Sequence, residues 1–475
     1  MPQKAENSMS KKKDSGFASI LVIYCLGLLI GGLFVGMVAP VRTVIQLDLG
    51  LDDSTGIWMI NIYTLFYAAL IPIIGKVADK YGRNRVFSIC ILVFMCGALI
   101  CGLSAKIGGF PMLLAGRIIQ ASGAGGMIPV ANAEIGTSFP KEKRGFALGI
   151  AAAVSGISNV LGSGVGSAIV QLVGAENWSV MFYIAAPICI ILFILTRIFL
   201  RKNTTAESGK MDYAGSVLFI AQILLLLLGL KGLDFFNIGA SITNPMVWIP
   251  LVLSIILTIL FIFVERRAKN PVFHIEFLHS KPIVITMITS FFIGCIIIAM
   301  MLVPEYAEYI MNAPAGSGGY YMLAIGITSM IGPPLGGKLV DKWGPKPVLI
   351  SGLMLMIGAY LFLAFYVSVH PSIISLVIGL AVVGLGLGFA MGSPTNYMIL
   401  ENTKKEDSTS AIATVALVRQ VGTTIAPAIF VGFISENNGI LGYQQMLICI
   451  TVFCVIATLF TIFYRSPIIN KSQEM

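Results

Sequence analysis

Apolar runs long enough to cross a lipid bilayer recur from one end of the chain to the other. A bilayer core about 30 Å thick is crossed by roughly 20 residues of α-helix, and the chain holds fourteen runs of about this length. None of them alternates with a period of two, which a closed barrel would require, so helices are the expected spanning elements. The runs cover residues 17–41, 57–77, 86–105, 111–133, 145–172, 178–200, 213–231, 246–265, 283–311, 319–341, 347–369, 372–400, 408–435 and 441–465.

The composition excludes a water-soluble body. Of the 475 residues, 57% are hydrophobic and 11% are charged, whereas soluble domains carry about 25% charged residues. A secreted enzyme, a cytosolic α/β protein and a nucleic-acid binder are therefore excluded as the main body. The eight cysteines lack CxxC spacing and the three histidines are scattered, so neither a metal site nor a catalytic cluster is expected. We expect an all-α integral membrane protein in the lipid bilayer, with no enzymatic activity and no cofactor.

Basic residues indicate the orientation of these runs. When both termini are placed in the cytoplasm, 26 of the 31 Lys and Arg residues fall in inner loops or termini, and only Lys106 and Lys231 fall in outer loops. Short loops with this asymmetry follow the positive-inside rule. The pattern predicts cytoplasmic termini in the cell membrane. The net charge of +9 is then an orientation signal and does not point to a nucleic-acid partner.

One short motif occurs twice. The string GKVADKYGRNR covers Gly75–Arg85, and GKLVDKWGPKP covers Gly337–Pro347, each at the inner end of the second run of a six-run set. Two six-helix bundles, 1–204 and 271–475, separated by a two-helix insert, 205–270, account for the fourteen runs. Secondary transporters are built from parallel repeats of this kind, with the transport site near the midplane between the halves.

These strings resemble the signature loop of the major facilitator superfamily, and within it the chain resembles the fourteen-helix drug:proton antiporters of bacteria. Several other parts of the chain resemble landmarks of that branch. They are Trp58, Tyr63, Arg117–Pro129, Asp212–Gly215, Glu265–Arg267 with Pro271, and Arg419–Gly422. The resemblance implies the major facilitator fold and alternating access. It also implies proton-coupled efflux of a small amphiphilic substrate.

The repeated loop is a candidate gate. Asp79 is able to accept hydrogen bonds from the amide end of a neighbouring helix and to pair with Arg83 or Arg85, while Gly75 permits close helix approach. The alternative is a solvated loop whose charges serve only orientation. The predicted latch comprises Gly75, Asp79, Gly82, Arg83, Arg85, Gly337, Asp341 and Gly344.

Ionisable residues inside apolar runs are candidates for coupling or substrate binding, because each costs at least about 2.5 kcal/mol at the centre of a span. Glu305 and Glu308 are three residues apart and share a helical face, so one is expected to carry protons. The alternatives are a solvated vestibule for these carboxylates and a structural interhelical role for Arg117. The full candidate set is Arg42, Trp58, Tyr63, Arg117, Gln120, Glu134, Glu305, Glu308, Asn396, Arg419 and Gln420.

Two positions differ from the antiporter pattern. The first run has Gly31-Gly32 where the branch carries an acid, and Ser163 replaces a proline of the fifth-run motif. These differences keep open the uptake or uniport of a small organic anion, such as a bile-acid-like molecule, without proton antiport. A transporter-like receptor is a further alternative. The chain has no nucleotide-binding domain, so an ion or substrate gradient, most simply a proton gradient, is the expected driving force. The protein is expected to function as a monomer.

Overall fold

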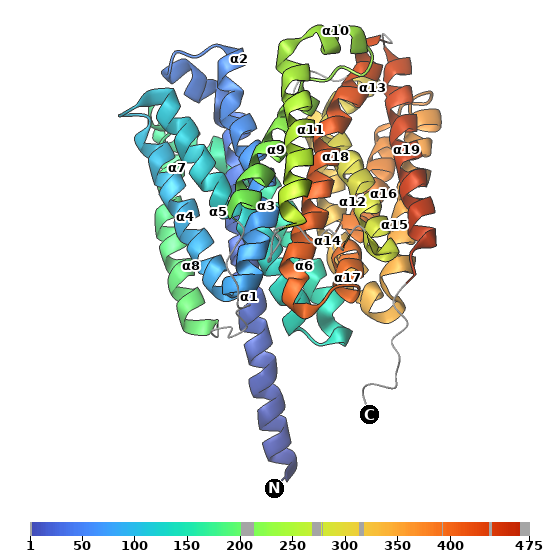
Figure 1. Cartoon of the computed structure of the whole chain (residues 1–475). Helices are drawn as coiled ribbons and strands as arrows, with labels where there is room; N and C mark the ends of the chain where they lie inside the picture. The colour runs from blue at the N-terminus through green and yellow to red at the C-terminus, as the bar shows by residue number, and fades with distance from the viewer. Residues whose placement is uncertain are drawn as a thin grey trace. The chain divides into compact units, whose positions relative to one another are not determined.

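The computed structural model describes residues 2–200, 213–267, 277, 279–312, 318–391, 393–436 and 439–465. Its regular elements in these ranges are all helical (Figure 1). They are α1 (Pro2–Asp48), α2 (Asp53–Gly56), α3 (Trp58–Tyr81), α4 (Arg83–Leu103), α5 (Gly109–Ser138), α6 (Lys141–Val173), η1 (Ala175–Asn177), α7 (Val180–Tyr183), α8 (Ala185–Phe199), α9 (Tyr213–Lys231), α10 (Ile238–Thr243), α11 (Pro245–Glu265), α12 (Lys281–Ile298), η3 (Ala299–Leu302), α13 (Val303–Met311), α14 (Gly318–Trp343), α15 (Pro345–Leu361), η4 (Phe362–Val367), α16 (Ile373–Met391), α17 (Ser393–Glu401), η5 (Lys405–Asp407), α18 (Ser408–Glu436) and α19 (Ile440–Phe463).

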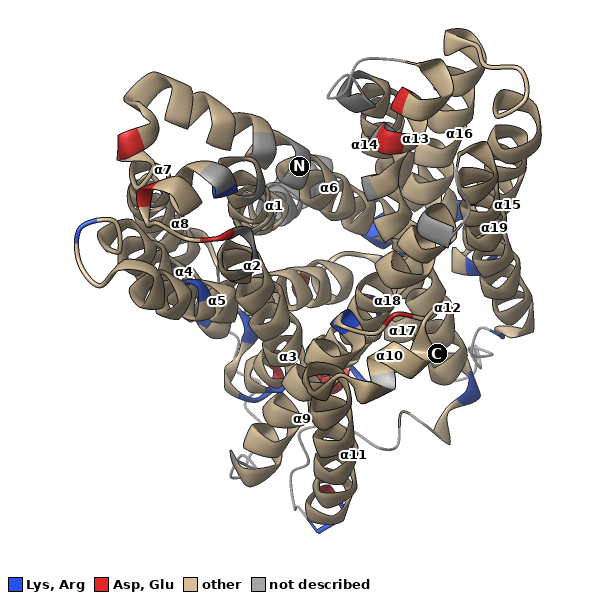
Figure 2. Ribbon diagram, turned by 90° about the horizontal axis from the view of Figure 1, so that it is seen from above, with Lys and Arg blue, Asp and Glu red and all other residues tan. Residues whose placement is uncertain are grey.

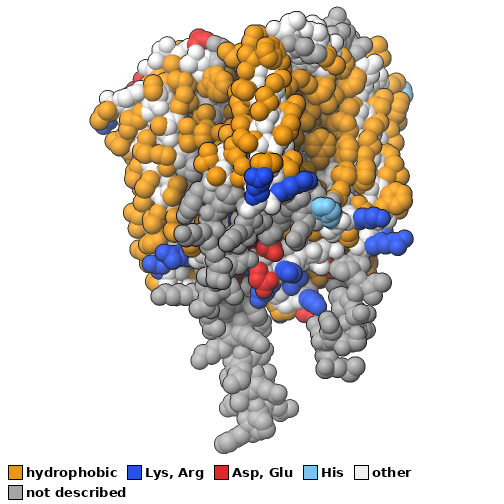
Figure 3. Space-filling view, viewed as in Figure 1, with side chains coloured by type: hydrophobic (Ala, Val, Ile, Leu, Met, Phe, Trp, Pro, Cys, Tyr) orange, Lys and Arg blue, Asp and Glu red, His pale blue; other side chains and the backbone are white. Residues whose placement is uncertain are grey.

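Twelve stretches of the described chain are helical, long and apolar enough to cross a membrane. They correspond to twelve of the fourteen predicted runs. Charged residues are sparse along the helices, which are mostly tan in Figure 2. Hydrophobic side chains cover most of the face seen in Figure 3, including the surface over α11, where Ile255 and Ile259 are 60% and 65% exposed.

The two remaining predicted runs form α5 and α6, which are 30 and 33 residues long but fall outside the set of twelve. Helix α5 falls outside this set because its close packing against α4 requires small residues in place of long apolar ones. A Cβ added at Gly97 of α4 would lie 2.2 Å from the Gln120 nitrogen, and one added at Gly123 would lie 2.5 Å from the Cys90 oxygen. The helices are present, but a count of fourteen spans is not confirmed by length and hydropathy.

The predicted run 283–311 is interrupted. Helix α12 ends at Ile298, a 3-10 turn covers Ala299–Leu302, and α13 begins at Val303 with a proline in its first turn. Proline lacks the backbone N–H that an α-helix interior needs, so a proline in the first turn of a new helix is tolerated there. The continuous helix expected from the apolar pattern is therefore wrong at this point.

The chain divides into two compact units. Unit 1 contains residues 1–140, 150–226 and 253–272, and unit 2 contains residues 141–149, 227–252 and 273–475. Helix α6 passes from unit 2 into unit 1 after Gly149, and the chain crosses twice more within α9 and α11. Within unit 2, α14 and α16 approach closely, because a Cβ on Gly332 would lie 2.8 Å from the Gly388 Cα.

Candidate functional site

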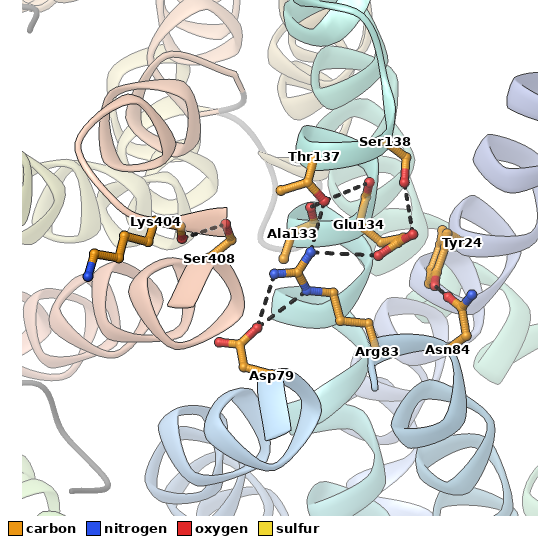
Figure 4. Close-up of polar contacts among 10 residues, drawn as sticks. All are labelled: Tyr24, Asp79, Arg83, Asn84, Ala133, Glu134, Thr137, Ser138, Lys404 and Ser408. Carbon is orange, nitrogen blue, oxygen red and sulfur yellow. Dashed lines mark hydrogen bonds and ion pairs between the residues drawn. The ribbon is translucent and has the colours of Figure 1, made fainter. Parts of the chain in front are cut away.

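The first copy of the repeated loop forms a buried ionic network in unit 1 (Figure 4). Helix α3 ends at Tyr81, Gly82 adopts φ 94°, and α4 begins at Arg83. Arg83 donates to Asp79 Oδ1 from Nε at 3.3 Å and from Nη2 at 3.1 Å. Of the two predicted partners of Asp79, Arg83 is therefore in contact, whereas Arg85 is exposed.

Arg83 also reaches α5. Its Nη1 donates to Thr137 Oγ1 at 2.9 Å and lies 3.7 Å from Glu134 Oε2. Glu134 accepts a further hydrogen bond from Ser138 Oγ at 2.8 Å. The side chains of Asp79, Arg83 and Glu134 are each less than a tenth exposed. The network therefore joins the α3–α4 turn to α5 through desolvated charges.

A hydrogen bond from the Tyr24 hydroxyl to Asn84 Oδ1 ties α1 to the beginning of α4 (Figure 4). The sequence-based reasoning missed this pair and the hydroxyls of Thr137 and Ser138. Asn84 lies inside the signature string, directly after Arg83, so its position next to the network could have been inferred. Tyr24 is distant in sequence and carried no such signal.

The second copy of the loop contacts the beginning of α6, and both partners belong to unit 2. Asp341 Oδ1 accepts a hydrogen bond from the Gly145 amide at 2.6 Å, and Oδ2 accepts one from the Phe146 amide at 2.9 Å. A carboxylate is stabilised near a helix N-terminus by the helix dipole. The sequence predicted an amide contact of this kind for Asp79; the structure shows it at Asp341, the equivalent position of the second copy, whereas Asp79 is held by Arg83.

Glycines make this approach possible. A Cβ added at Gly337 would lie 2.2 Å from the Gly145 oxygen, and one added at Gly145 would lie 2.5 Å from the Gly337 oxygen. Gly344 adopts φ 83° between α14 and α15, as Gly82 does between α3 and α4. Gly75 is buried within α3. The glycines of the predicted latch therefore lie at turns, inside a helix or at the closest backbone contact.

Arg117 is 1% exposed in α5 and has only neutral partners within the described residues. Its Nε donates to the Met59 oxygen at 3.1 Å and its Nη1 donates to Gln120 Oε1 at 2.7 Å. Its Cζ lies 4.1 Å from the centroid of the Tyr63 ring. The carbonyl, the amide and the ring face compensate the cation in part, and no carboxylate among the described residues neutralises it.

Two polar atoms beside this guanidinium have no hydrogen-bond partner in the described part of the chain. They are the Tyr63 hydroxyl and Gln120 Nε2, and both are buried. The Gln120 amide is already bonded to Arg117 through its oxygen, so its nitrogen lies close to the same cation. Trp58, at the beginning of α3, is 37% exposed and is not brought into the cluster.

The carboxylates of α13 are more accessible than the arginine. Glu305 is exposed, and its Oε1 accepts a hydrogen bond from the Tyr443 hydroxyl at 2.9 Å. Glu308 is half-buried one turn further along. The Tyr443 ring lies 5.2 Å from that of Tyr309, so aromatic groups line one side of this acidic pair.

The other candidates are dispersed. Arg419 and Gln420 are half-buried on α18, where a Cβ on Gly294 of α12 would lie 2.1 Å from the Arg419 oxygen. Arg42 is half-buried near the end of α1, and Asn396 is buried in α17. No group of three or more His, Cys, Asp or Glu side chains in the described ranges is placed to hold a metal ion.

The fold and these sites define a multi-span membrane protein of the transporter class. Apolar helices form the body, the loop motif is repeated, and buried charges lie at helix ends and inside helices. Residues 24–427 match the Major Facilitator Superfamily, and the chain belongs to this family of transporters. It is therefore a multi-pass cell-membrane transporter and not an enzyme.

Relatives of similar length support this assignment. The chain is 32% identical over 435 residues to the uncharacterised MFS-type transporter YfiU of Bacillus subtilis, covering 90% of this chain and 82% of that protein. It is 26% identical over 430 residues to the riboflavin transporter RibZ of Clostridioides difficile, covering 90% and 89%. It is 28% identical over 428 residues to multidrug resistance protein 3 of Bacillus subtilis, covering 87% and 79%.

Solved structures share the fold at low sequence identity. The proton:xylose symporter XylE aligns with a TM-score of 0.68 at 14% identity, covering 95% of this chain and 97% of that one. The human organic anion transporter MFSD10 aligns with a TM-score of 0.65 at 13% identity, covering 94% and 99%. Identities this low establish the architecture alone.

Proposed function

We propose that this protein is a secondary active transporter that exports small amphiphilic organic molecules across the cytoplasmic membrane in exchange for protons. The observation that carries the proposal is the contact of Asp341 with the Gly145 and Phe146 amides. A carboxylate held by backbone amides at a close helix contact is able to hold one conformation and to release it. The similarity to multidrug resistance protein 3 supports efflux as the direction.

In this proposal α5 and α6 also cross the membrane, which gives fourteen spans with both termini in the cytoplasm. The functional divisions are the bundles 1–204 and 271–475 with the insert 205–270. Both repeated loops then lie on the cytoplasmic side, where the basic residues are concentrated. Their role is to close that side while the substrate site is open to the outside.

Proton coupling is assigned to Arg117 together with Glu305. An arginine does not lose its proton in a protein, so a carboxylate has to carry it. Glu305 is exposed on α13, and its Oε1 accepts a hydrogen bond from the Tyr443 hydroxyl at 2.9 Å. Glu134, which is already paired with Arg83, belongs to the latch in this assignment.

A second candidate function is the uptake or uniport of a small organic anion without protons. Arg117 favours it, because a buried cation with neutral partners and nearby unpaired donors is complementary to a carboxylate. Gly31-Gly32 in the first span, where the antiporter pattern has an acid, points the same way.

Flux measurements with matched substrates separate these functions. The purified protein is reconstituted in liposomes and given pairs of amphiphiles that differ only in a carboxylate, an amide or an amine. Proton-coupled efflux predicts transport of neutral or cationic members that depends on a pH gradient. Transport of the carboxylates alone, without such dependence, would favour the organic-anion function. Binding without net movement of any substrate would identify a receptor and overturn both.

A further inference from the structure

Helix α15 does not end as a regular α-helix. It continues into η4 (Phe362–Val367), which is π-helical. The Ser368 amide donates to the Leu363 oxygen at 3.0 Å, a hydrogen bond that spans five residues instead of the four of an α-helix. Such turns are rare, and they occur frequently at functional sites. Because the turn changes which carbonyls the helix itself binds, donors from other helices are able to reach them.

Two consecutive carbonyls of η4 accept hydrogen bonds from two other helices of unit 2. The Tyr306 hydroxyl of α13 donates to the Leu363 oxygen at 3.0 Å. Gln444 Nε2 of α19 donates to the Ala364 oxygen, also at 3.0 Å. Leu363 and Ala364 are 1% and 0% exposed, so both bonds end inside the packed bundle. The η4 segment is therefore a common anchor for α13 and α19.

The position of α13 depends on this anchor. A 3-10 turn, Ala299–Leu302, separates α13 from α12, so α13 is not the direct continuation of a longer helix. The Tyr306 side chain is buried, and its hydroxyl also lies 3.1 Å from Ser368 Oγ, which donates to the Leu363 oxygen at 2.9 Å. A buried hydroxyl that loses its partners is destabilising. These bonds therefore favour one placement of α13 against η4.

The residues that precede the two donors are bonded to each other. Glu305 directly precedes Tyr306 in α13. Tyr443 directly precedes Gln444 in α19, and its hydroxyl donates to Glu305 Oε1 at 2.9 Å. The Tyr443 ring also lies 5.8 Å from the Tyr306 ring, measured between centroids. Anchoring Tyr306 and Gln444 on one segment therefore fixes the spacing of α13 and α19 at the point where Glu305 meets Tyr443.

We propose that Tyr306 and Gln444 are positioning residues for proton coupling and that η4 is the support they share. By binding consecutive carbonyls of this segment, they hold α13 and α19 at the spacing at which the Tyr443 hydroxyl reaches the Glu305 carboxylate. They act on coupling through this pair and carry no proton themselves. The inference rests on the proposed function, in which Glu305 carries the proton.

Substitutions that each remove one donor test this role in liposomes under an imposed pH gradient. Tyr306→Phe keeps the aromatic ring, and Gln444→Met keeps a side chain of similar length, but each loses its hydrogen bond to η4. Each variant is expected to accumulate a transported amphiphile about threefold less than the wild type, within the range that one hydrogen bond contributes. Equilibration without the gradient should stay within about twofold of the wild type. Tyr366→Phe removes an exposed hydroxyl from η4 and is the matched control, with wild-type accumulation.

Tyr443→Phe distinguishes positioning from a general loss of stability. This variant removes the hydroxyl that binds Glu305, so it should lower accumulation by at least about threefold on its own. Adding Tyr306→Phe or Gln444→Met should then change accumulation by less than about 1.5-fold, because both act through the bond already lost. Wild-type accumulation in any of the three single variants would overturn the proposal, as would losses that multiply in the double variants.

Hydrogen exchange of α13 tests the anchoring without transport, and melting temperatures establish that each variant is folded. The amides of Val303–Met311 should exchange at least about threefold faster in Tyr306→Phe and Gln444→Met than in the wild type, because the contacts that hold α13 are lost. Unchanged exchange in both variants would overturn the anchoring by η4. Failure of the wild-type protein to accumulate substrate under the pH gradient would instead overturn the proposed function, and the exchange of α13 would still decide whether η4 positions this helix.

Discussion

Arg117 is a buried cation in α5, and its partners among the described residues are the Met59 carbonyl, the Gln120 amide and the Tyr63 ring. A lone arginine within an apolar run is unusual enough to be noticed. Its neighbours are a backbone carbonyl, an amide one turn away and an aromatic ring on another helix. Backbone carbonyls carry no sequence signal, and the Tyr63 ring is placed by the packing of α3 against α5. That the described residues place no carboxylate against this cation is therefore a property that only the folded chain reveals.

Two substitutions of Arg117 should distinguish the effect of its charge on substrate flux from the effect of its planar guanidinium. Arg117→Gln is expected to lower substrate flux by at least about tenfold, since a buried charge and its hydrogen bonds to Met59 and Gln120 are lost. Arg117→Lys retains the charge but not the planar fork, so it should recover only part of the flux. Initial rates in liposomes measure both variants. Equal rates for all three proteins would remove Arg117 from the transport site.

The role of Asp341 is tested by Asp341→Asn. This variant keeps a side-chain oxygen but loses the charge that faces the Gly145 and Phe146 amides, a loss of about 0.3–1 kcal/mol in the latched state. We expect a several-fold change in turnover with a small change in melting temperature. Lys342→Gln removes an exposed charge next to it and serves as control. If both variants transport like the wild type, the contact is structural and not a latch.

At the scale of helices, the apolar pattern predicted where most elements lie but not how they are interrupted. The run 283–311 divides at the 3-10 turn Ala299–Leu302, because the four apolar residues of this turn give the same hydropathy in either geometry. The helix that contacts the second copy of the loop could not be predicted from the sequence either. The beginning of α6 contributes backbone amides, and the glycines on both helices identify a close contact without identifying the partner.

The close contact of α6 and α14 predicts different effects on stability for alanine substitutions at two glycines of α14. Gly337→Ala places a methyl group 2.2 Å from the Gly145 oxygen and should destabilise the protein by about 1–3 kcal/mol. Gly326→Ala meets nothing within 4 Å and should be tolerated. Thermal unfolding in detergent compares the two. Equal melting temperatures would contradict the tight packing at Gly337.

The number of membrane spans depends on whether α5 and α6 cross the bilayer. If both cross the membrane, a cysteine at Lys106 and one at Lys141 lie on opposite sides, with Lys141 in the cytoplasm. If neither crosses, the two positions lie on the same side. Labelling intact cells with an impermeant thiol reagent should therefore modify Lys106→Cys and not Lys141→Cys. Equal labelling of both would leave twelve spans.

For the whole molecule, the repeat and the charge asymmetry were enough to predict a membrane transporter, and membership of the Major Facilitator Superfamily confirms that class. The substrate and the driving ion depend on a few side chains, such as Arg117 and Glu305. Their selectivity arises from local contacts that composition and periodicity do not encode. Relatives with names as different as riboflavin transporter and multidrug resistance protein show how far substrate varies on similar sequences.

The most direct measurement is substrate accumulation in liposomes under an imposed pH gradient. With one transported amphiphile and the wild-type protein, proton-coupled transport predicts accumulation above equilibrium that scales with the gradient and disappears when a protonophore collapses it. The Glu305→Gln variant should still equilibrate the substrate but lose this accumulation. Equilibration that ignores the pH gradient in the wild type would contradict proton exchange.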